Sequence, residues 1–419
     1  MLGFNKEITV IARSKPLRAL VAILVVGLVC ALLQGCATNE APQQGQSTAA
    51  GSRPLEISPE VKGRRGSIVE TQPVENPSQP LADLKSRQYK VVYRSVSGVD
   101  GSGREVSGTV VVPAGAPPAG GWPIIAYGHG MTGIGNECGP SGYPDLLGYD
   151  LVVASLVSLG YVVTLPDYEG LGYPGAHPLL EPRTAAFNMI DAVRAARNVV
   201  PATSTKWFAV GISQGGQASW AASEYAGEYG DGLDLLGSAS MAPVVDMSKF
   251  ASLAESGWLS KEQQVLMPML VHGLRATHPE LNPADYLGGA LAKNTDTWLA
   301  CTGPLVQQRL AGADQIRESD TVPVSKEAAA KLERIFADYS LPQRPATAPM
   351  LVITGADDET VRAQWVRSAV EKACEMGDVV EFTVRSGEGH TNLNGGPRLS
   401  GWLTERMKGA APVDNCNEV

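Results

Sequence analysis

The sequence predicts an α/β fold, in which a mostly parallel, doubly wound sheet carries helices on both faces and a helical cap is inserted over one edge. Two observations lead to this prediction. Short apolar runs without alternation take turns with helical stretches, which is typical of parallel strands that are buried on both faces. Between two of these strands, residues 245–345 form an interval of about a hundred residues without a convincing strand, and an insertion of this size indicates a cap.

Length, composition and charge exclude several classes of protein. A chain of 419 residues, of which 44% are hydrophobic, can bury a sizeable core. The 46 glycines and 29 prolines show no fixed period, which excludes collagen and solenoid arrays and favours many turns. A formal net charge of −9 offers no basic face that could replace phosphate counterions, so we expect no nucleic acid partner.

Residues 1–35 are expected to be a cleaved lipoprotein signal peptide. After a basic start, the apolar run from Ala19 to Leu33 has the length of a signal-peptide core and is shorter than the about 20 residues that span a bilayer. The run ends in Leu33-Gln34-Gly35-Cys36, which resembles the bacterial lipobox, where the cysteine is lipidated and becomes the new N-terminus. An ordinary cleaved signal, with Cys36 there by chance, is the alternative.

A lipid on Cys36 would anchor the protein in the bacterial cell envelope. Ala37 follows the cysteine in place of the aspartate that resembles an inner-membrane retention signal, so the outer membrane is favoured, with secretion as the alternative. Residues 36–88 are expected to form a disordered tether behind this anchor. From Ala37 to Gln88 there is no aromatic residue, and polar residues and proline dominate, so the stretch cannot bury enough apolar surface to order itself.

The folded part is expected to consist of a first core segment (89–244), the helical cap (245–345) and a second core segment (346–419). The predicted strands are Tyr89–Val96, Glu105–Val112, Trp122–Tyr127, Tyr161–Leu165, Trp207–Gly211, Leu236–Met241, Pro349–Thr354 and Val379–Val384. The predicted core helices are Tyr149–Leu159, Arg183–Val199, Gly216–Tyr229 and Ala363–Met376, and the predicted cap helices are Glu262–Leu274, Pro283–Ala292 and Lys326–Tyr339. Alternation in the second strand predicts that it pairs with the first as a hairpin.

The cysteines fit an exported protein. Export would leave four of them in an oxidising compartment, where an even number favours two disulfides, with three possible pairings. The four are far apart in the sequence and lack nearby histidines, so a zinc site is the less favoured interpretation. They are Cys138, Cys301, Cys374 and Cys416.

A candidate nucleophile lies in Gly211-Ile212-Ser213-Gln214-Gly215, directly after a predicted strand and before a helical run. This is the GxSxG pattern of a nucleophile elbow, a sharp turn that lifts the serine hydroxyl above the sheet, with glycines where side chains would collide. The pentapeptide alone is a weak signal in a glycine-rich chain, and a serine in an ordinary turn is the alternative. Its position between a strand and a helix favours Ser213 as the nucleophile.

A serine needs a base, and a histidine close to neutral pKa is the usual one. The chain has five histidines, and in this type of fold the order along the chain is serine, acid, histidine. His390 alone follows the last predicted strand, in the small-residue loop Gly387-Glu388-Gly389-His390. We therefore expect His390 to be the base, with an ordinary surface histidine as the alternative.

The acid that orients this histidine should follow the preceding strand. Three carboxylates compete in the segment Gly355-Ala356-Asp357-Asp358-Glu359-Thr360-Val361. The spacing G-x-x-D-x-x-V selects Asp358, and Asp357 is the fallback. The other acids there would be solvated or would cap the next helix.

The tetrahedral intermediate of acyl transfer also needs donors for its oxyanion. One is expected from the backbone N–H of Gln214, the residue after the nucleophile. The second should come from the loop after an early strand, and the Gly128-His129-Gly130-Met131-Thr132-Gly133 segment makes the Met131 N–H the expected donor. A plain glycine turn is the alternative.

At these motifs the sequence resembles the α/β-hydrolases, and among them the secretory lipase family of fungal lipase A type, which has bacterial relatives. The resemblance runs from about residue 89 to residue 416 and extends beyond the elbow to three more segments. These are Gly160–Gly170, with Pro166-Asp167-Tyr168-Glu169-Gly170 at its end, Ala276–Pro279 in the cap, and Asp358-Glu359-x-Val361. Fungal members carry a Tyr-Glu-Asp segment where this chain has residues 128–132, which is a departure at the second oxyanion donor.

The resemblance implies roles and pairings. By it, Ser213, Asp358 and His390 are nucleophile, acid and base, while Asp167 and Glu169 support a loop and are not assigned to catalysis. It further implies disulfides that join Cys138 to Cys301 and Cys374 to Cys416, the first of which ties the oxyanion loop to the cap.

The residues together predict a serine hydrolase of carboxylic esters that needs no cofactor and no metal. The resemblance and the large cap favour lipid substrates, such as triacylglycerols or long-chain acyl esters. The alternatives are a carboxylesterase for short-chain, polyester or plant-wall esters, a peptidase of the same fold, and an inactive binding protein on the cell surface. The sequence leaves acyl preference, cap motion and oligomeric state open.

Overall fold

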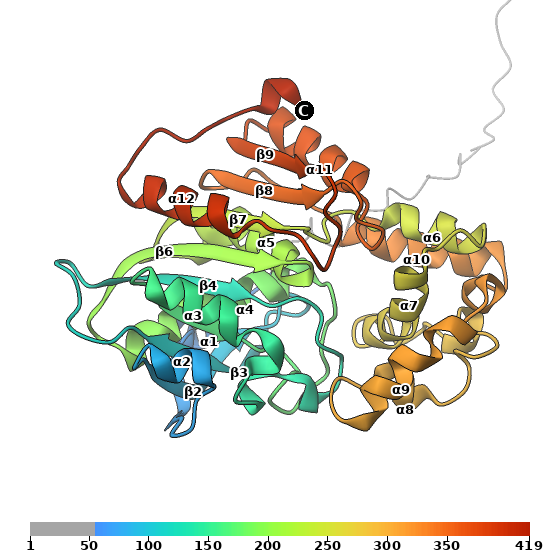
Figure 1. Ribbon diagram of the computed structural model, residues 1–419, viewed down its shortest axis with the longest axis horizontal. Helices are drawn as coiled ribbons and strands as arrows, with labels where there is room; N and C mark the ends of the chain where they lie inside the picture. The colour runs from blue at the N-terminus through green and yellow to red at the C-terminus, as the bar shows by residue number, and fades with distance from the viewer. Residues whose placement is uncertain (1–54) are drawn as a thin grey trace, which may run out of the picture. The chain divides into compact units, whose positions relative to one another are not determined.

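The computed structural model describes residues 55–419, which all belong to one compact unit (Figure 1). The predicted signal peptide (1–35), the lipobox cysteine Cys36 and the first part of the predicted tether lie outside the described residues. Among residues 55–419, no helix is both long and apolar enough to cross a membrane.

A nine-stranded sheet in the order β1-β2-β3-β5-β4-β6-β7-β8-β9 forms the centre of this unit. The strands are β1 (Ile68–Pro73), β2 (Arg87–Val96), β3 (Gly103–Val112), β4 (Trp122–Gly128), β5 (Val162–Pro166), β6 (Thr203–Ile212), β7 (Asp234–Met241), β8 (Met350–Gly355) and β9 (Val380–Arg385). The pairings among β4 to β9 are parallel, and β1, β2 and β3 extend the sheet antiparallel. The eight predicted strands and the predicted hairpin of the first two are confirmed.

Helices cover both faces of the sheet, as the apolar strands predict. Along β4, Ile124 and Ala126 belong to one hydrophobic core, and the alternate residues Ile125 and Tyr127 belong to the other. Helices α4, α5 and α11 contribute to the first core, and α2, α3 and α12 to the second. These helices are α2 (Gln79–Asp83), α3 (Asp150–Ser158), α4 (Pro182–Val199), α5 (Gln214–Tyr229), α11 (Ala363–Glu375) and α12 (Gly396–Met407).

The structure differs from the disordered tether predicted for residues 36–88, because the described part of that stretch is folded. It contains helix α1 (Pro59–Arg64), strand β1 and helix α2. Strand β1 is a polar edge strand that is ordered by its backbone pairing with β2, and Leu81 of α2 is fully buried in the second core. Composition underestimated this segment, because an edge strand needs hydrogen-bonding partners more than it needs apolar residues. The sheet therefore begins at Ile68 and not at residue 89.

The expected insertion between β7 and β8 consists of helices α6 (Ser248–Glu255), α7 (Lys261–Leu274), α8 (Thr295–Leu299), α9 (Pro304–Gly312) and α10 (Lys326–Asp338). Figure 1 places these helices together beside the sheet domain. The predicted helix over 283–292 is wrong, since only the 3₁₀ turn η5 (Pro283–Asp285) forms there. Gly288 and Gly289, the latter at φ +48°, do not favour a helix after that turn.

Candidate active site

Ser213 stands at the junction between β6 and α5, at φ +58° and ψ −119°, a conformation that non-glycine residues rarely adopt. Its N–H donates to the Met241 carbonyl of β7 at 2.9 Å, which holds the turn against the neighbouring strand. A Cβ on Gly211 would overlap the Gly215 backbone, and one on Gly215 would overlap the Gly128 carbonyl. The two glycines of the pentapeptide are therefore required by the close approach of three backbone segments.

The structure brings the three predicted residues Ser213, His390 and Asp358 together from distant parts of the chain. His390 Nε2 lies 2.9 Å from Ser213 Oγ, and His390 Nδ1 lies 2.7 Å from Asp358 Oδ2. The Asp358 side chain is fully buried, whereas the His390 side chain is 17% exposed. This arrangement can pass the serine proton to the imidazole while the carboxylate holds the ring in one tautomer.

The geometry distinguishes Asp358 from its fallback. Asp357 is exposed, whereas the second oxygen of Asp358 accepts the N–H groups of Thr360 at 2.9 Å and Val361 at 2.7 Å. These two bonds fix the carboxylate plane and leave Oδ2 for the histidine.

The first turn of α7 forms hydrogen bonds with the loop that carries Asp358. The Gln263 side chain donates to the Thr360 carbonyl at 3.0 Å, and the Ser260 hydroxyl donates to the Glu359 carbonyl at the same distance. Both residues form the capping box of α7, so the first turn of a helix in the insertion is fixed to the acid loop. The insertion thus contributes to the position of Asp358.

The segment after β4 lies against Ser213. A Cβ built on Gly130 would come within 3.4 Å of the Ser213 Cβ. The Gly130 N–H donates to the Tyr149 hydroxyl at 2.9 Å, and the Thr132 hydroxyl donates to the Cys138 carbonyl at 2.8 Å. Met131, the predicted oxyanion donor, is therefore held between two anchored neighbours.

Residues of two motifs that the sequence analysis quoted, one after β4 and one after β5, support this segment. His129 is fully buried, its Nδ1 lies 2.7 Å from the Gly130 carbonyl, and its Nε2 lies 3.3 Å from the Asp167 carbonyl. Tyr168 packs its ring against His129, with ring centroids 4.6 Å apart, and its hydroxyl donates to the His129 carbonyl at 3.2 Å. Burial lowers the pKa of His129, so the ring is neutral around pH 7.

The sequence model of the secretory lipase family matches residues 147–415, which include the elbow, the acid loop and His390. The chain belongs to the secretory lipase family.

Proteins similar to this secretory lipase family member are named for different activities. A protein of Mycobacterium tuberculosis named "Probable inactive lipase" is 23% identical over 372 residues, which cover 84% of this chain and 80% of that protein. Lipase A of Candida antarctica in its closed state superposes with a TM-score of 0.68 at 17% identity, over 87% of this chain and 88% of the other. The rice cell wall degrading esterase LipA of Xanthomonas oryzae superposes with a TM-score of 0.65 at 20% identity, over 82% of this chain and 96% of the other. These likenesses establish the α/β-hydrolase fold.

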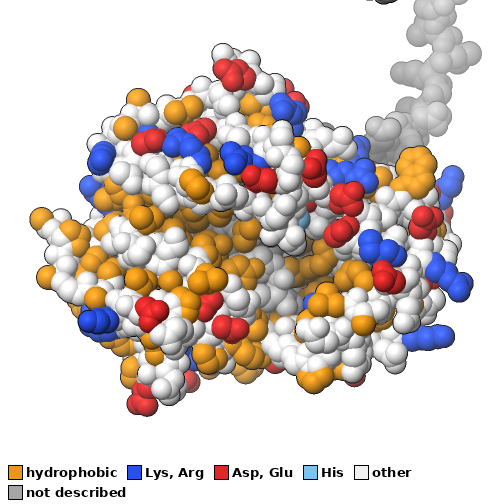
Figure 2. Space-filling view, viewed as in Figure 1, with side chains coloured by type: hydrophobic (Ala, Val, Ile, Leu, Met, Phe, Trp, Pro, Cys, Tyr) orange, Lys and Arg blue, Asp and Glu red, His pale blue; other side chains and the backbone are white. Residues whose placement is uncertain are grey.

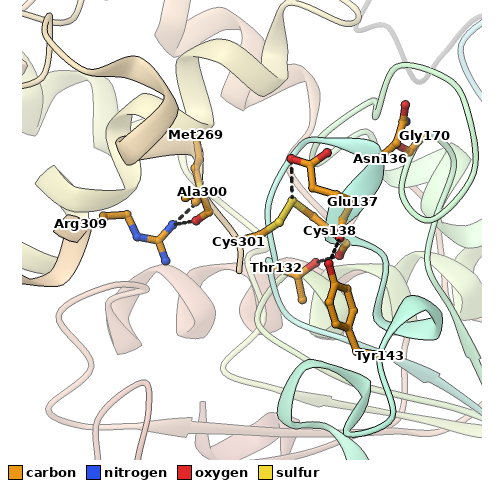
Figure 3. Close-up of a disulfide and its surroundings, with 10 residues drawn as sticks. All are labelled: Thr132, Asn136, Glu137, Cys138, Tyr143, Gly170, Met269, Ala300, Cys301 and Arg309. Carbon is orange, nitrogen blue, oxygen red and sulfur yellow. Dashed lines mark hydrogen bonds between the residues drawn. A yellow bond between two sulfur atoms is a disulfide. The ribbon is translucent and has the colours of Figure 1, made fainter. Parts of the chain in front are cut away.

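The two disulfides that the resemblance to secretory lipases implied are present, as Cys138–Cys301 and Cys374–Cys416. Figure 3 shows the first, which joins the loop after β4 to the segment between α8 and α9 of the insertion. Glu137 lies beside it, with its carboxylate 3.9 Å from Cys138 Sγ. Because the sulfurs of Cys138 and Cys301 are bonded to each other, the group of Glu137, Cys138 and Cys301 offers no thiolate to a metal ion.

Proposed function

We propose that this secretory lipase family member is a serine carboxylic ester hydrolase, and that its substrates are lipids or other long-chain acyl esters. The observation that carries the proposal is the continuous contact from Ser213 Oγ through His390 to Asp358, with separations of 2.9 and 2.7 Å. A relay of this geometry, with a buried acid, is what activation of a serine hydroxyl requires.

The proposed reaction has two acyl-transfer steps. Ser213 Oγ attacks the ester carbonyl carbon while His390 Nε2 takes the hydroxyl proton, and the carbonyl oxygen becomes an oxyanion. His390 returns the proton to the leaving alcohol, and the acyl group stays on Ser213. A water molecule, deprotonated by His390, then attacks the acyl-enzyme and releases the carboxylic acid.

The oxyanion would be held by two backbone N–H groups, those of Gln214 and Met131. Gln214 is the first residue of α5, where an N–H has no acceptor inside the helix and the helix dipole favours negative charge. The Gly130 N–H is already bound to Tyr149, which supports the next N–H along the chain as the second donor.

The lipid substrate class is favoured by the family and by the insertion. In Figure 2, hydrophobic side chains gather where the helical insertion meets the sheet domain. A carboxylesterase is the second candidate, because the similar Xanthomonas oryzae protein is named as an esterase that degrades rice cell wall. The peptidase alternative has no observation in its favour. The complete relay argues against an inactive binding protein, although one relative bears the name of an inactive lipase.

The test uses p-nitrophenyl esters from acetate to oleate on the purified protein and on Ser213→Ala. We expect turnover by the wild type, a rate that rises towards long acyl chains, and loss of turnover in the variant by more than about a thousandfold. A maximum at acetate or butyrate would instead favour the carboxylesterase. Absence of turnover on every ester, or an unchanged rate in Ser213→Ala, would refute the proposal.

We also propose that Cys36 carries a lipid that anchors the protein in the bacterial outer membrane. The support is the Leu33-Gln34-Gly35-Cys36 sequence after an apolar run, and secretion of a free protein is the alternative. Labelled palmitate should be incorporated by the wild type and not by Cys36→Ser. Equal labelling of both, or of neither, contradicts the proposal.

A further inference from the structure

The buried turn after β5 contacts both sides of the site. Asp167 is fully buried, and its carboxylate accepts the Ser107 hydroxyl at 2.6 Å and the Ser141 N–H at 2.8 Å. The Asp167 carbonyl lies next to His129, on the side of the expected Met131 donor. Two residues later, the Glu169 carbonyl lies 2.8 Å from His177 Nδ1.

Glu169 is itself fixed at several points. Its N–H donates to the Asn188 side chain of α4 at 2.8 Å, and its carboxylate accepts from Arg104 at 2.7 Å. A Cβ on Gly170, which has φ +79°, would overlap the backbone of Ala176 and His177. The segment that carries His177 therefore packs closely against this turn, and these contacts fix the position of the His177 ring.

The chemistry of its partners determines the state of the His177 ring. The ring is buried, and burial lowers its pKa to about 4, so it is neutral at pH 7. A carbonyl oxygen only accepts hydrogen bonds, so the proton lies on Nδ1 and is donated to Glu169. Nε2 is then an acceptor, and it lies 3.0 Å from the side-chain amide nitrogen of Gln214, which donates to it.

Gln214 is the residue whose backbone N–H is the expected first oxyanion donor. The residue is 3% exposed, and its side-chain amide oxygen is buried without a hydrogen-bonding partner. Within residues 55–419, the His177 ring is thus the one hydrogen-bonding partner of this amide group. The contact spans 37 positions of the sequence and ends on the residue that follows the nucleophile.

We propose that His177 is a positioning residue for the oxyanion hole, which acts through the side chain of Gln214 to hold the Gln214 N–H in place. The inference rests on the proposed ester hydrolase function. His177 stabilises the transition state only once charge develops on the carbonyl oxygen of the substrate. Its loss should therefore lower kcat and leave KM nearly unchanged.

Two substitutions separate this role from packing. In His177→Asn, the amide nitrogen takes the place of Nδ1 and can still donate to the Glu169 carbonyl. The shorter side chain has no atom at the position of Nε2, so the hydrogen bond from Gln214 is lost. In His177→Gln, the amide oxygen takes the place of Nε2 and can accept from Gln214. We expect kcat for p-nitrophenyl butyrate to fall about 10- to 100-fold in His177→Asn, and to recover to within about threefold of wild type in His177→Gln.

A third variant tests the partner. Gln214→Met keeps the length of the side chain and removes its amide, so it should lower kcat as much as His177→Asn does. The double variant should lose no more than either single variant, because both remove the same contact. His272→Asn, on helix α7 of the insertion, makes the same chemical change elsewhere and serves as the control. Thermal unfolding of each variant confirms that it is folded.

The outcomes distinguish this inference from the function on which it rests. A wild-type protein without turnover refutes the proposed function itself. An active wild type with unchanged kcat in His177→Asn refutes the positioning role, and so does an equal loss in His177→Asn and His177→Gln, which would indicate packing. If His177→Asn does not fold, Gln214→Met decides alone, since an unchanged kcat there overturns the inference.

Discussion

Replacing Asp358 by asparagine should remove activity while it leaves the fold of the site intact. In the wild type, Asp358 Oδ1 accepts two backbone N–H groups, from Thr360 at 2.9 Å and Val361 at 2.7 Å. Asparagine has one acceptor oxygen, and these two donors hold it in the Oδ1 position. The amide nitrogen must then face His390 Nδ1, where Asp358 Oδ2 lies in the wild type at 2.7 Å.

This exchange reverses the tautomer of His390. An amide nitrogen donates, so Nδ1 has to accept, and the imidazole proton moves to Nε2, which lies 2.9 Å from Ser213 Oγ. A protonated Nε2 cannot take the serine proton. A carboxylate-to-amide change of this kind lowers kcat by about 10⁴ in triads of the same geometry, which corresponds to about 5 kcal/mol of transition-state stabilisation.

The assay is steady-state hydrolysis of p-nitrophenyl butyrate at pH 8, with kcat and KM determined separately. KM should change little, because the Asp358 side chain is fully buried against His390. Asp357→Asn is the matched control: the same substitution at the exposed neighbouring residue should retain wild-type kcat. A kcat within about tenfold of wild type in Asp358→Asn, or a larger loss in Asp357→Asn, would show that this relay does not activate Ser213.

Two further predictions concern stability. Mutation of Cys138 and Cys301 to serine opens a closed loop of 163 residues, and mutation of Cys374 and Cys416 opens one of 42. Chain entropy predicts that the free energy of unfolding falls by about 5 kcal/mol for the first pair and by about 4 kcal/mol for the second. Chemical denaturation measures both values, and a larger loss for the shorter loop contradicts this reasoning. Burial raises the pKa of Glu224 to about 8, so its neutral form stabilises the fold at low pH, and this contribution is lost as pH rises from about 4 through 8. Glu224→Gln should raise the melting temperature at pH 9 by removing a cost of about a few kcal/mol, with little effect at pH 5, and an equal shift at both pH values would exclude titration as the cause.

The elements of the sheet were predictable because their signals are local. Buried parallel strands such as β8 are continuous apolar runs, and each of the eight expected strands is present within a few residues of its predicted bounds. The N-terminal part was not predictable in the same way. Strand β1 has a mostly exposed surface and owes its order to β2, so its own residues carry no periodic signal. Helix α12 was missed although its buried residues Leu399, Trp402, Leu403 and Arg406 follow a helical spacing.

The candidate site divides in a similar manner. Ser213 was identified from turn chemistry, since a sharp strand-to-helix turn requires flanking glycines. His390 and Asp358 were identified from chain order and from the spacing after a strand. His177 and Tyr149 were not, because a buried histidine and a tyrosine at a helix start have no local feature that indicates their distant partners Gln214 and Gly130.

By itself, the sequence determined the class of fold and predicted Ser213 and His390 for the proposed relay, with Asp358 favoured over Asp357, because periodicity, turn-forming glycines and chain order are written in short segments. Tertiary structure alone decided which acid reaches His390 and that residues 59–88 join the sheet domain. It also decided that His177 meets the residue after the nucleophile. Each of these depends on hydrogen bonds between groups far apart in the chain, which local sequence patterns do not encode.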